Sequence, residues 1–180
     1  MCRAVNEAFI RLHDSGKIAR KKSLVNWSCH LQTAISDIEV DHRTVDGPTL
    51  IRVPGYDEPV RFGLLYQFAY KLADDEDQEI VVSTTRPETM VGDTAVAVHP
   101  EDTRYSRYIG RFVQHPIRME KIPIIADTSV DPHFGTGALK ITPAHDPNDY
   151  RTAECHQLPM INIFDNQGKA NENCGTLAVI

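Results

Sequence analysis

Ionisable side chains gather in one short stretch of the sequence, KITPAHDPNDY, which covers residues 140–150. A lysine and two nearby carboxylates at one turn can act as catalysts, as a clamp for a polar ligand, or as a helix start. The helix start explains part of the pattern, because Asp146 is a good N-cap, Pro147 suits the first helical position and Asp149 falls in the first turn. It does not explain Lys140, which lies on the strand-like run before the turn.

Two further polar clusters precede this stretch. The first, STTRPETMVGD (83–93), ends a strand-like run in two threonines and an arginine, and the second, FGTGALK (134–140), has glycines that let a backbone approach a ligand closely. Each has a purely structural alternative: a capping box formed by Thr84, Thr85 and Glu88, and a glycine turn. Strand ends can converge at one rim of an antiparallel β-rich domain, so the three clusters together predict one pocket.

Several common catalytic patterns are absent from the sequence. It has no GxSxG, no HExxH, no GxGxxG after a strand and no Walker A loop, and no nucleophile can be paired with a nearby base. Hydrolysis would therefore use a positioned water. His145 is interpreted as a structural hydrogen-bonding residue, and a metal-dependent hydrolase using His145, Asp146 and Asp149 is the alternative. The two Cys-His pairs lack zinc-site spacing, and we expect no metal ion.

Composition narrows the class of protein. The 180 residues are 41% apolar and 24% charged, as in an ordinary globular domain. No apolar run could span a bilayer and no secretory signal is visible, so an intracellular setting with free thiols is expected. The net charge of −6 argues against a protein whose main task is gripping nucleic acid alone, although basic clusters at 17–22 and 104–111 could meet a polyanion from one side.

The elements that must position these clusters follow from hydrophobic periodicity. Helical spacing predicts a helix over residues 2–15, stopped by Gly16, and a second helix from Pro147 to His156. Alternating or β-branched runs predict many short strands. These strands are expected at 24–27, 50–53, 62–72, 79–85, 94–100, 111–117, 121–127, 137–142 and 160–164. Many strands and few helices predict an α+β domain with a closed or barrel-like sheet.

The long motifs resemble a known family. STTRPETMVGDTAVAVHPEDTRY (83–105) and FGTGALKITPAHDPNDY (134–150) closely resemble the editing domain of valyl-tRNA synthetases. NWSCHLQTAISDIEV (26–40) and VPGYDEPVRFG (53–63) are similar to the segments that lead into that domain, so the likeness covers nearly the whole chain. The isoleucyl and leucyl enzymes share related motifs, but the full aspartate pair and TAISDIEV indicate the valyl branch. A mild departure is Ser28-Cys29, which lies outside the pocket motifs.

The resemblance implies the β-barrel-like α+β editing (CP1) domain of these class I synthetases without the synthetic site, because HIGH and KMSKS motifs are absent. Residues 1–45 would form an N-terminal helix and connecting segment, and 46–180 the editing core. The implied activity is an aminoacyl-tRNA ester hydrolase that removes threonine misattached to valine tRNA. A non-catalytic module that binds a tRNA acceptor end or threonine is the alternative.

The resemblance also implies partners and site residues. The partners would be the acceptor end of tRNA(Val) carrying threonine and the remainder of the parent synthetase, in the cytoplasm or mitochondria, with no membrane. No cofactor is expected, since ATP serves only the synthetic domain. Asp149 resembles the residue that holds the substrate ammonium, while Lys140, Asp146 and Thr84 resemble the groups that read the threonine hydroxyl and, with Asp149, steer a water. The groups implied for the terminal adenosine and the pocket wall are Arg86, Phe134 and Thr85.

Overall fold

The computed structural model describes residues 1–177, and residues 178–180 lie outside the described part of the chain. Within the described part, no helix is both long and apolar enough to cross a membrane. Residues 1–177 form two α-helices, α1 (Cys2–Asp14) and α2 (Pro147–His156), and both match the predicted helices. Short 3₁₀ helices complete the helical part: η1 (Asp37–Glu39), η2 (Pro87–Gly92), η3 (Ser106–Tyr108) and η4 (Glu172–Leu177).

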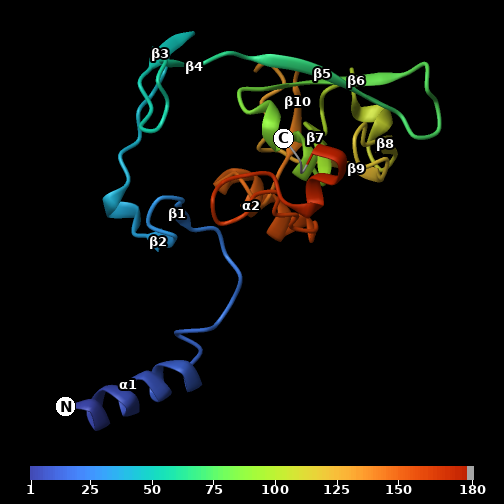
Figure 1. Ribbon diagram of the computed structural model, residues 1–180. Helices are drawn as coiled ribbons and strands as arrows, with labels where there is room; N and C mark the ends of the chain where they lie inside the picture. The colour runs from blue at the N-terminus through green and yellow to red at the C-terminus, as the bar shows by residue number, and fades with distance from the viewer. Residues whose placement is uncertain (178–180) are drawn as a thin grey trace.

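A four-stranded mixed sheet forms the centre of the molecule (Figure 1). Its strands are β7 (Ala95–Val98), β8 (Phe112–Gln114), β9 (Lys121–Ala126) and β10 (Ala138–Ile141), in the order β10-β7-β9-β8. The pair β7–β9 is parallel and the other two pairs are antiparallel. All four residues of β7 are buried, so this strand is covered on both faces.

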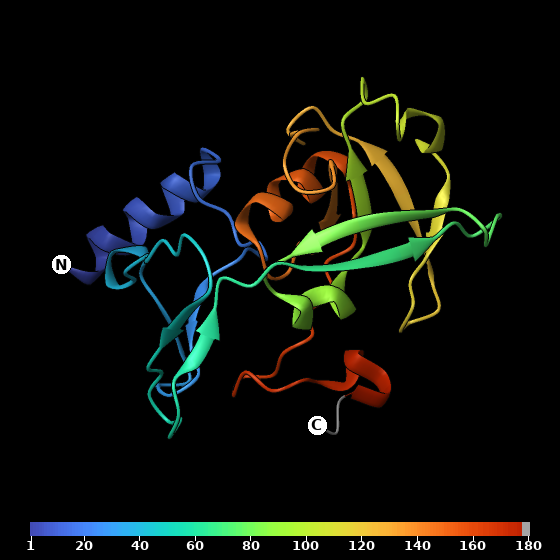
Figure 2. The same cartoon turned by 90° about the horizontal axis from the view of Figure 1, so that it is seen from above.

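A long hairpin curls over this sheet (Figure 2). It consists of β5 (Tyr66–Lys71) and β6 (Glu79–Thr84), paired along their whole length. A bridge between Leu72 and Val113 joins the hairpin to β8, while β6 packs beside β10. Hairpin and sheet therefore wrap around one core in a barrel-like α+β arrangement, as predicted. Core side chains from both include Tyr70, Leu72, Ile80, Val82, Val96, Val98, Val113 and Ile124.

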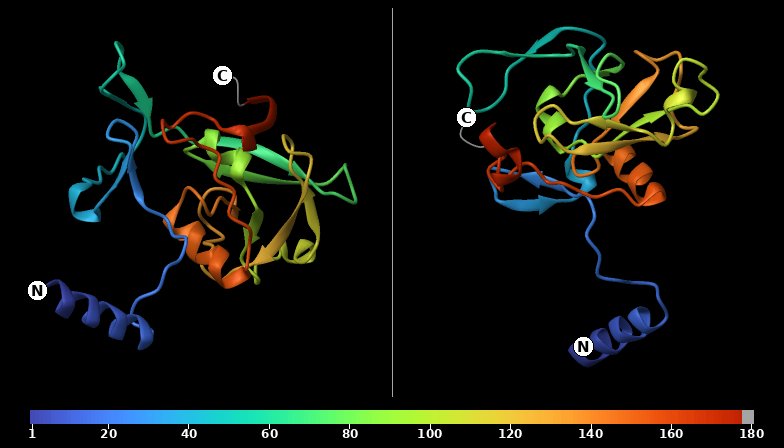
Figure 3. Two further views of the ribbon diagram at one scale, coloured as in Figure 1. Left: turned by 60° about the horizontal axis from the view of Figure 1, so that its bottom comes forward. Right: turned by 90° about the vertical axis from the view of Figure 1, so that its right-hand side faces the viewer.

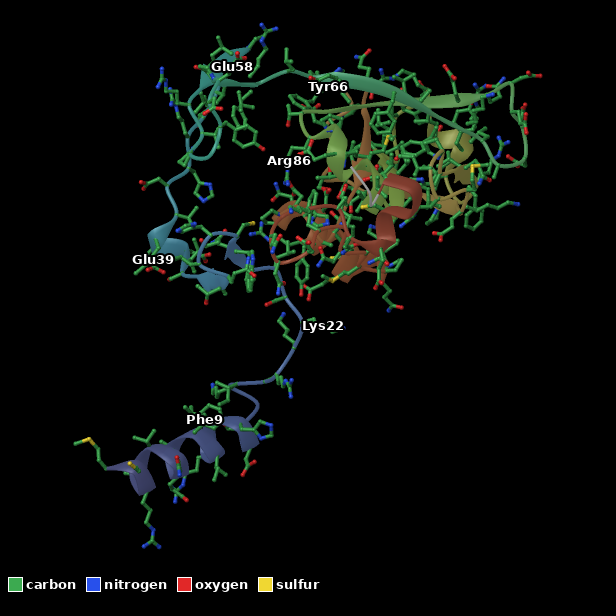
Figure 4. The ribbon with its side chains drawn as sticks, viewed as in Figure 1. Phe9, Lys22, Glu39, Glu58, Tyr66 and Arg86 are labelled. Atoms are coloured by element: carbon green, nitrogen blue, oxygen red, sulfur yellow. The ribbon has the colours of Figure 1, made fainter. Side chains whose placement is uncertain are left out.

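The alternation predicted for the strand of residues 62–72 is confirmed only over its second half. Tyr70 and Leu72 are fully buried and Phe68 packs against them, but Tyr66 on the same face is 45% exposed. The reason is that the hairpin extends past the edge of the sheet at its Tyr66 end, next to the peripheral segments (Figure 4).

The N-terminal segments lie outside this core (Figures 1 and 3). Helix α1 stands apart from the rest and buries none of its residues, and Phe9 is exposed at a distance from the core side chains (Figure 4). Two small hairpins follow, β1 (Asn26–Ser28) with β2 (Thr33–Ile35), and β3 (Thr49–Ile51) with β4 (Val60–Phe62). Every buried residue of the described chain lies between Tyr70 and Cys174. The division of the chain at residue 46 stays a prediction.

One predicted strand is wrong. MINIF (160–164) forms no strand, and Phe164 alone makes an isolated bridge, to Ala170. The backbone of Ile163 is satisfied without a partner strand, because its N–H donates to His145 and its carbonyl accepts from the N–H of Asn171. An apolar run with β propensity can therefore be buried as an irregular segment when side chains and turns supply its hydrogen bonds.

Candidate functional site

The start of α2 is built as the sequence predicts. Asp146 is the N-cap, and its Oδ1 accepts from the N–H groups of Asn148 at 2.8 Å and Asp149 at 3.1 Å. Pro147 occupies the first turn, where a missing N–H costs nothing. Only one oxygen of Asp146 serves the cap; no described residue donates to Oδ2.

Asp149 has a different role from Asp146. Its side chain does not reach back to the helix start, and its Oδ2 accepts from the backbone N–H of Thr142 at 2.8 Å. The residue is only 8% exposed. Burial, together with the charge of Asp146, raises the pKa of the Asp149 carboxyl to about 6, against the hydrogen bond from Thr142. A buried carboxylate that lacks a cationic partner is well suited to bind a cationic ligand.

Lys140 lies on β10 and is 5% exposed. Its Nζ donates to Thr89 Oγ1 at 2.9 Å, to Asp93 Oδ1 at 3.0 Å and to Thr142 Oγ1. An ammonium has three hydrogens, so all three are engaged by protein oxygens in this structure.

Asp93 stands behind this lysine and is fully buried. Besides Lys140, it accepts from the hydroxyl of Thr142 and, through Oδ2, from Tyr70 Oη at 2.5 Å. Arg118 donates to its backbone carbonyl at 2.7 Å. Burial raises the pKa of the Asp93 carboxyl, while the Lys140 ammonium and the two hydroxyl donors oppose that rise.

The turn from β6 into η2 holds the threonines of the first cluster. Thr84 Oγ1 accepts from the N–H of Arg86 at 3.0 Å, and Thr89 Oγ1 donates to the carbonyl of Arg86 at 2.8 Å. No side chain caps η2, so the capping box of Thr84, Thr85 and Glu88 is wrong. The hydroxyl of Thr84 is engaged elsewhere: it accepts from the N–H of Arg86, two residues on, and so closes a tight turn that precedes the helix.

Arg86 joins this turn to the opening of α2. Its Nη1 donates to the backbone carbonyl of His145 at 2.8 Å, across the mouth of the site, and its Nε lies 3.5 Å from Glu88. The side chain is half exposed and lies below the Tyr66 end of the hairpin (Figure 4). It therefore keeps free donors at the surface.

The glycine loop presents an aromatic ring to solvent. Phe134 is 74% exposed, which is unusual for phenylalanine next to a polar pocket. Gly137 has a φ of +78°, and a Cβ there would lie 2.2 Å from a guanidinium nitrogen of Arg104. The loop needs glycine at that position because both backbone conformation and space exclude a side chain.

One pocket of about 240 Å³ brings the three clusters together. Strands β6 and β10 and the starts of η2 and α2 meet at the same rim, as expected for converging strand ends. The structure places all seven predicted site residues around it: Thr84, Thr85, Arg86, Phe134, Lys140, Asp146 and Asp149. Their individual roles stay predictions.

Four residues of this site were missed from the sequence: Tyr70, Thr89, Asp93 and Thr142. Thr142 had a usable signal, since it stands two positions after Lys140 and so shares its face of a strand. Asp93 and Thr89 were inside a quoted motif, but nothing local marks them as partners of a lysine 47 and 51 residues away, respectively. In the sequence, Tyr70 was recognisable only as part of the apolar face of the strand predicted over residues 62–72.

His145 lines the pocket as a structural residue. Its Nε2 accepts from the N–H of Ile163 at 3.1 Å, and its ring packs edge-to-face on Phe164 with centroids 4.9 Å apart. Burial and the charges of Arg86 and Lys140 lower the pKa of His145 to about 4, so the ring is neutral near pH 7. Among residues 1–177, no three His, Cys, Asp or Glu side chains cluster closely enough to hold a metal ion.

Comparison with known proteins shows the family of this chain. The sequence model of the family "tRNA synthetases class I (I, L, M and V)" matches residues 1–174, and the chain belongs to this family. Within it, the chain is similar to valine--tRNA ligases: 55% identical over 179 residues to that of Schizosaccharomyces pombe (99% of this chain, 18% of the relative), and 60% over 165 residues to that of Takifugu rubripes (92% and 14%).

A mitochondrial relative and one solved structure complete the comparison. The mitochondrial valine--tRNA ligase of Saccharomyces cerevisiae is 55% identical over 176 residues, which are 97% of this chain and 16% of the relative. The chain thus spans less than a fifth of the length of these relatives. A ternary LeuRS-tRNA-LeuAMS complex of Agrobacterium radiobacter K84 contains a chain that is 25% identical, with a TM-score of 0.47, covering 54% of this chain and 16% of its own.

Proposed function

We propose that this chain is the editing part of a valyl-tRNA synthetase and hydrolyses threonine esterified to valine tRNA. The observation that carries the proposal is Asp149, a buried carboxylate without a cationic partner, at the edge of a pocket whose floor is made of Lys140, Thr89 and Thr142. An α-ammonium and a neighbouring hydroxyl would satisfy these groups together. The family and the valine--tRNA ligase relatives support the assignment.

The physics of discrimination explains why such a pocket is needed. Valine and threonine are nearly isosteric, and a hydrophobic pocket rejects an added hydroxyl by only about 10²-fold, a value established for valyl-tRNA synthetases themselves rather than derived from this structure. A polar pocket rejects valine instead, because the methyl group of valine, in place of the threonine hydroxyl, leaves buried polar atoms of the pocket unpaired. This pocket has the polar lining that the second situation requires.

In the proposed complex, Asp149 holds the substrate ammonium and the terminal adenosine packs on Phe134 near Arg86. The pocket offers no neutral imidazole free to act as a base, because Nε2 of His145 already accepts a hydrogen bond. Asp146 lines the pocket and has an oxygen, Oδ2, that the helix cap does not use, so it can orient a water toward the ester carbonyl. Catalysis here rests on positioning of that water.

Deacylation of threonyl-tRNA(Val) and valyl-tRNA(Val) tests the proposal. The chain and a full-length valine--tRNA ligase relative should be assayed in parallel, because the net charge of −6 predicts weak tRNA binding by the chain alone. The threonyl ester should be hydrolysed in clear preference to the valyl ester. Binding of threonyl-tRNA(Val) without hydrolysis would instead support the non-catalytic module.

The pH dependence of hydrolysis should follow Asp149. Only its ionised form attracts the substrate ammonium, and its pKa is about 6 in the free protein. We therefore expect kcat/KM to fall about tenfold per pH unit below that pKa and to level off above it. Single-turnover rates between about pH 4.5 and 7, corrected for spontaneous ester hydrolysis, measure this profile. A flat profile across pH 6 would contradict the role of Asp149.

Phe134→Ala should weaken substrate binding without affecting folding. The ring is exposed, so its loss should change the free energy of unfolding by less than about 0.5 kcal/mol. A lost base-stacking contact should raise KM for threonyl-tRNA(Val) about tenfold or more. Phe112→Ala is the matched control, since Phe112 is also exposed but lies on β8 away from the pocket. Equal KM values for the two variants would remove Phe134 from the site.

A further inference from the structure

The side chains at the floor of the pocket, Lys140, Thr89 and Thr142, donate all their polar hydrogens to other protein groups. Lys140 donates its three to Asp93, Thr89 and Thr142. The hydroxyl of Thr142 donates to Asp93, and that of Thr89 donates to the carbonyl of Arg86. A hydroxyl has one hydrogen and two lone pairs, so each threonine keeps one lone pair and no donor.

Asp93 sets this direction for Lys140 and Thr142. It has no exposed surface and does not line the pocket, yet its oxygens accept from Tyr70, Lys140 and Thr142. A carboxylate can only accept, so every group that contacts it must turn a hydrogen inward. An amide in its place would donate through its NH₂, and it would remove the charge that anchors the ammonium.

We propose that Asp93 is a positioning residue for substrate selection: by drawing the hydrogens of Lys140 and Thr142 inward, it leaves the pocket floor able only to accept. This inference rests on the proposed editing function. A floor of acceptors selects an aminoacyl side chain that carries a donor. Threonine satisfies it with its hydroxyl hydrogen, whereas valine leaves the lone pairs of Thr89 and Thr142 buried and unpaired.

The test is the ratio of threonyl to valyl ester hydrolysis by the full chain carrying Asp93→Asn. We expect the ratio of the two kcat/KM values to fall at least about tenfold, since the reoriented floor offers a donor and loses its fixed ammonium. Asp102→Asn is the matched control. Asp102 is also a buried acid in an ion pair, with Arg104, but it lies outside this pocket, so its variant should keep the ratio. An unchanged ratio in a folded Asp93→Asn variant overturns the inference.

Two measurements cover the case in which Asp93→Asn does not fold. Tyr70→Phe removes a single hydrogen bond to Asp93, at a residue that does not line the pocket, and should lower the same ratio by a smaller factor. In the unaltered chain, ¹⁵N-detected NMR should show a slowly exchanging ammonium signal that disappears in Lys140→Met. A rapidly exchanging Lys140 ammonium would overturn the inference without any measurement of activity.

Failure of the inference and failure of the proposed function give different results. If the unaltered chain and the full-length relative both leave threonyl-tRNA(Val) intact, the editing function fails and the inference fails with it. If both hydrolyse it and Asp93→Asn retains the preference, the function stands and only the role of Asp93 is lost.

Discussion

Asp149→Asn should reduce hydrolysis of threonyl-tRNA(Val) by at least about 100-fold, because the variant leaves the substrate ammonium buried without a counter-charge. The amide is nearly isosteric with the carboxylate, and its oxygen can still accept from the N–H of Thr142. Folding should therefore be preserved. Single-turnover deacylation and thermal unfolding of the same preparation measure both effects.

The sign of the stability change is part of this prediction. Folding raises the pKa of Asp149 to about 6, so the protonated form favours the folded state. The stabilisation from Asp149 is present at low pH and is lost as the pH rises through about 6. At pH 7.5 the ionised carboxylate is a cost, and Asp149→Asn should leave the free energy of unfolding unchanged or higher.

Glu154→Gln is the control for Asp149→Asn. Glu154 is an exposed acid on the same helix, outside the pocket, so its variant should hydrolyse at the unaltered rate. Normal hydrolysis by Asp149→Asn would exclude Asp149 as the ammonium site. Loss of hydrolysis accompanied by unfolding would contradict the prediction that the carboxylate serves the ligand rather than the helix.

Lys140→Met should affect both selectivity and stability. Removing the ammonium leaves Asp93 fully buried without a cationic partner, which typically costs about 3–5 kcal/mol. It also releases the hydrogen bonds that orient Thr89 and Thr142, so the preference for threonyl over valyl esters should decline. Chemical denaturation and the two deacylation rates measure these effects separately.

The double variant Lys140→Met with Asp93→Asn provides the internal control. Removing both charges avoids the uncompensated carboxylate, so much of the lost stability should return, while selectivity stays low. An unchanged threonyl preference in Lys140→Met would contradict the role of the lysine. Because all three hydrogens of Lys140 are engaged in this structure, we expect it to act mainly through the two threonines rather than by direct donation to the substrate.

Features that depend on neighbouring residues could be predicted from the sequence alone. Asp146 and Pro147 start a helix because the hydrogen bonds that cap it reach only two and three residues along the chain. Strands β6 and β9 start with the period-2 burial that alternating side chains predict, and the three polar clusters stand at strand or helix ends that a β-rich domain tends to bring together. Sequence motifs also indicated the family.

Tertiary structure decided the features that depend on distant partners. Asp149 could have capped its own helix, but burial against β10 directs it to Thr142 and raises its pKa. The partnership of Lys140 with Asp93 joins residues 47 positions apart, and the irregular path of residues 160–164 depends on His145, 18 positions before Ile163. Such pairs determine where the buried side chains lie, because a buried polar group must find its hydrogen-bond partner inside the protein. No local pattern records which partner that is.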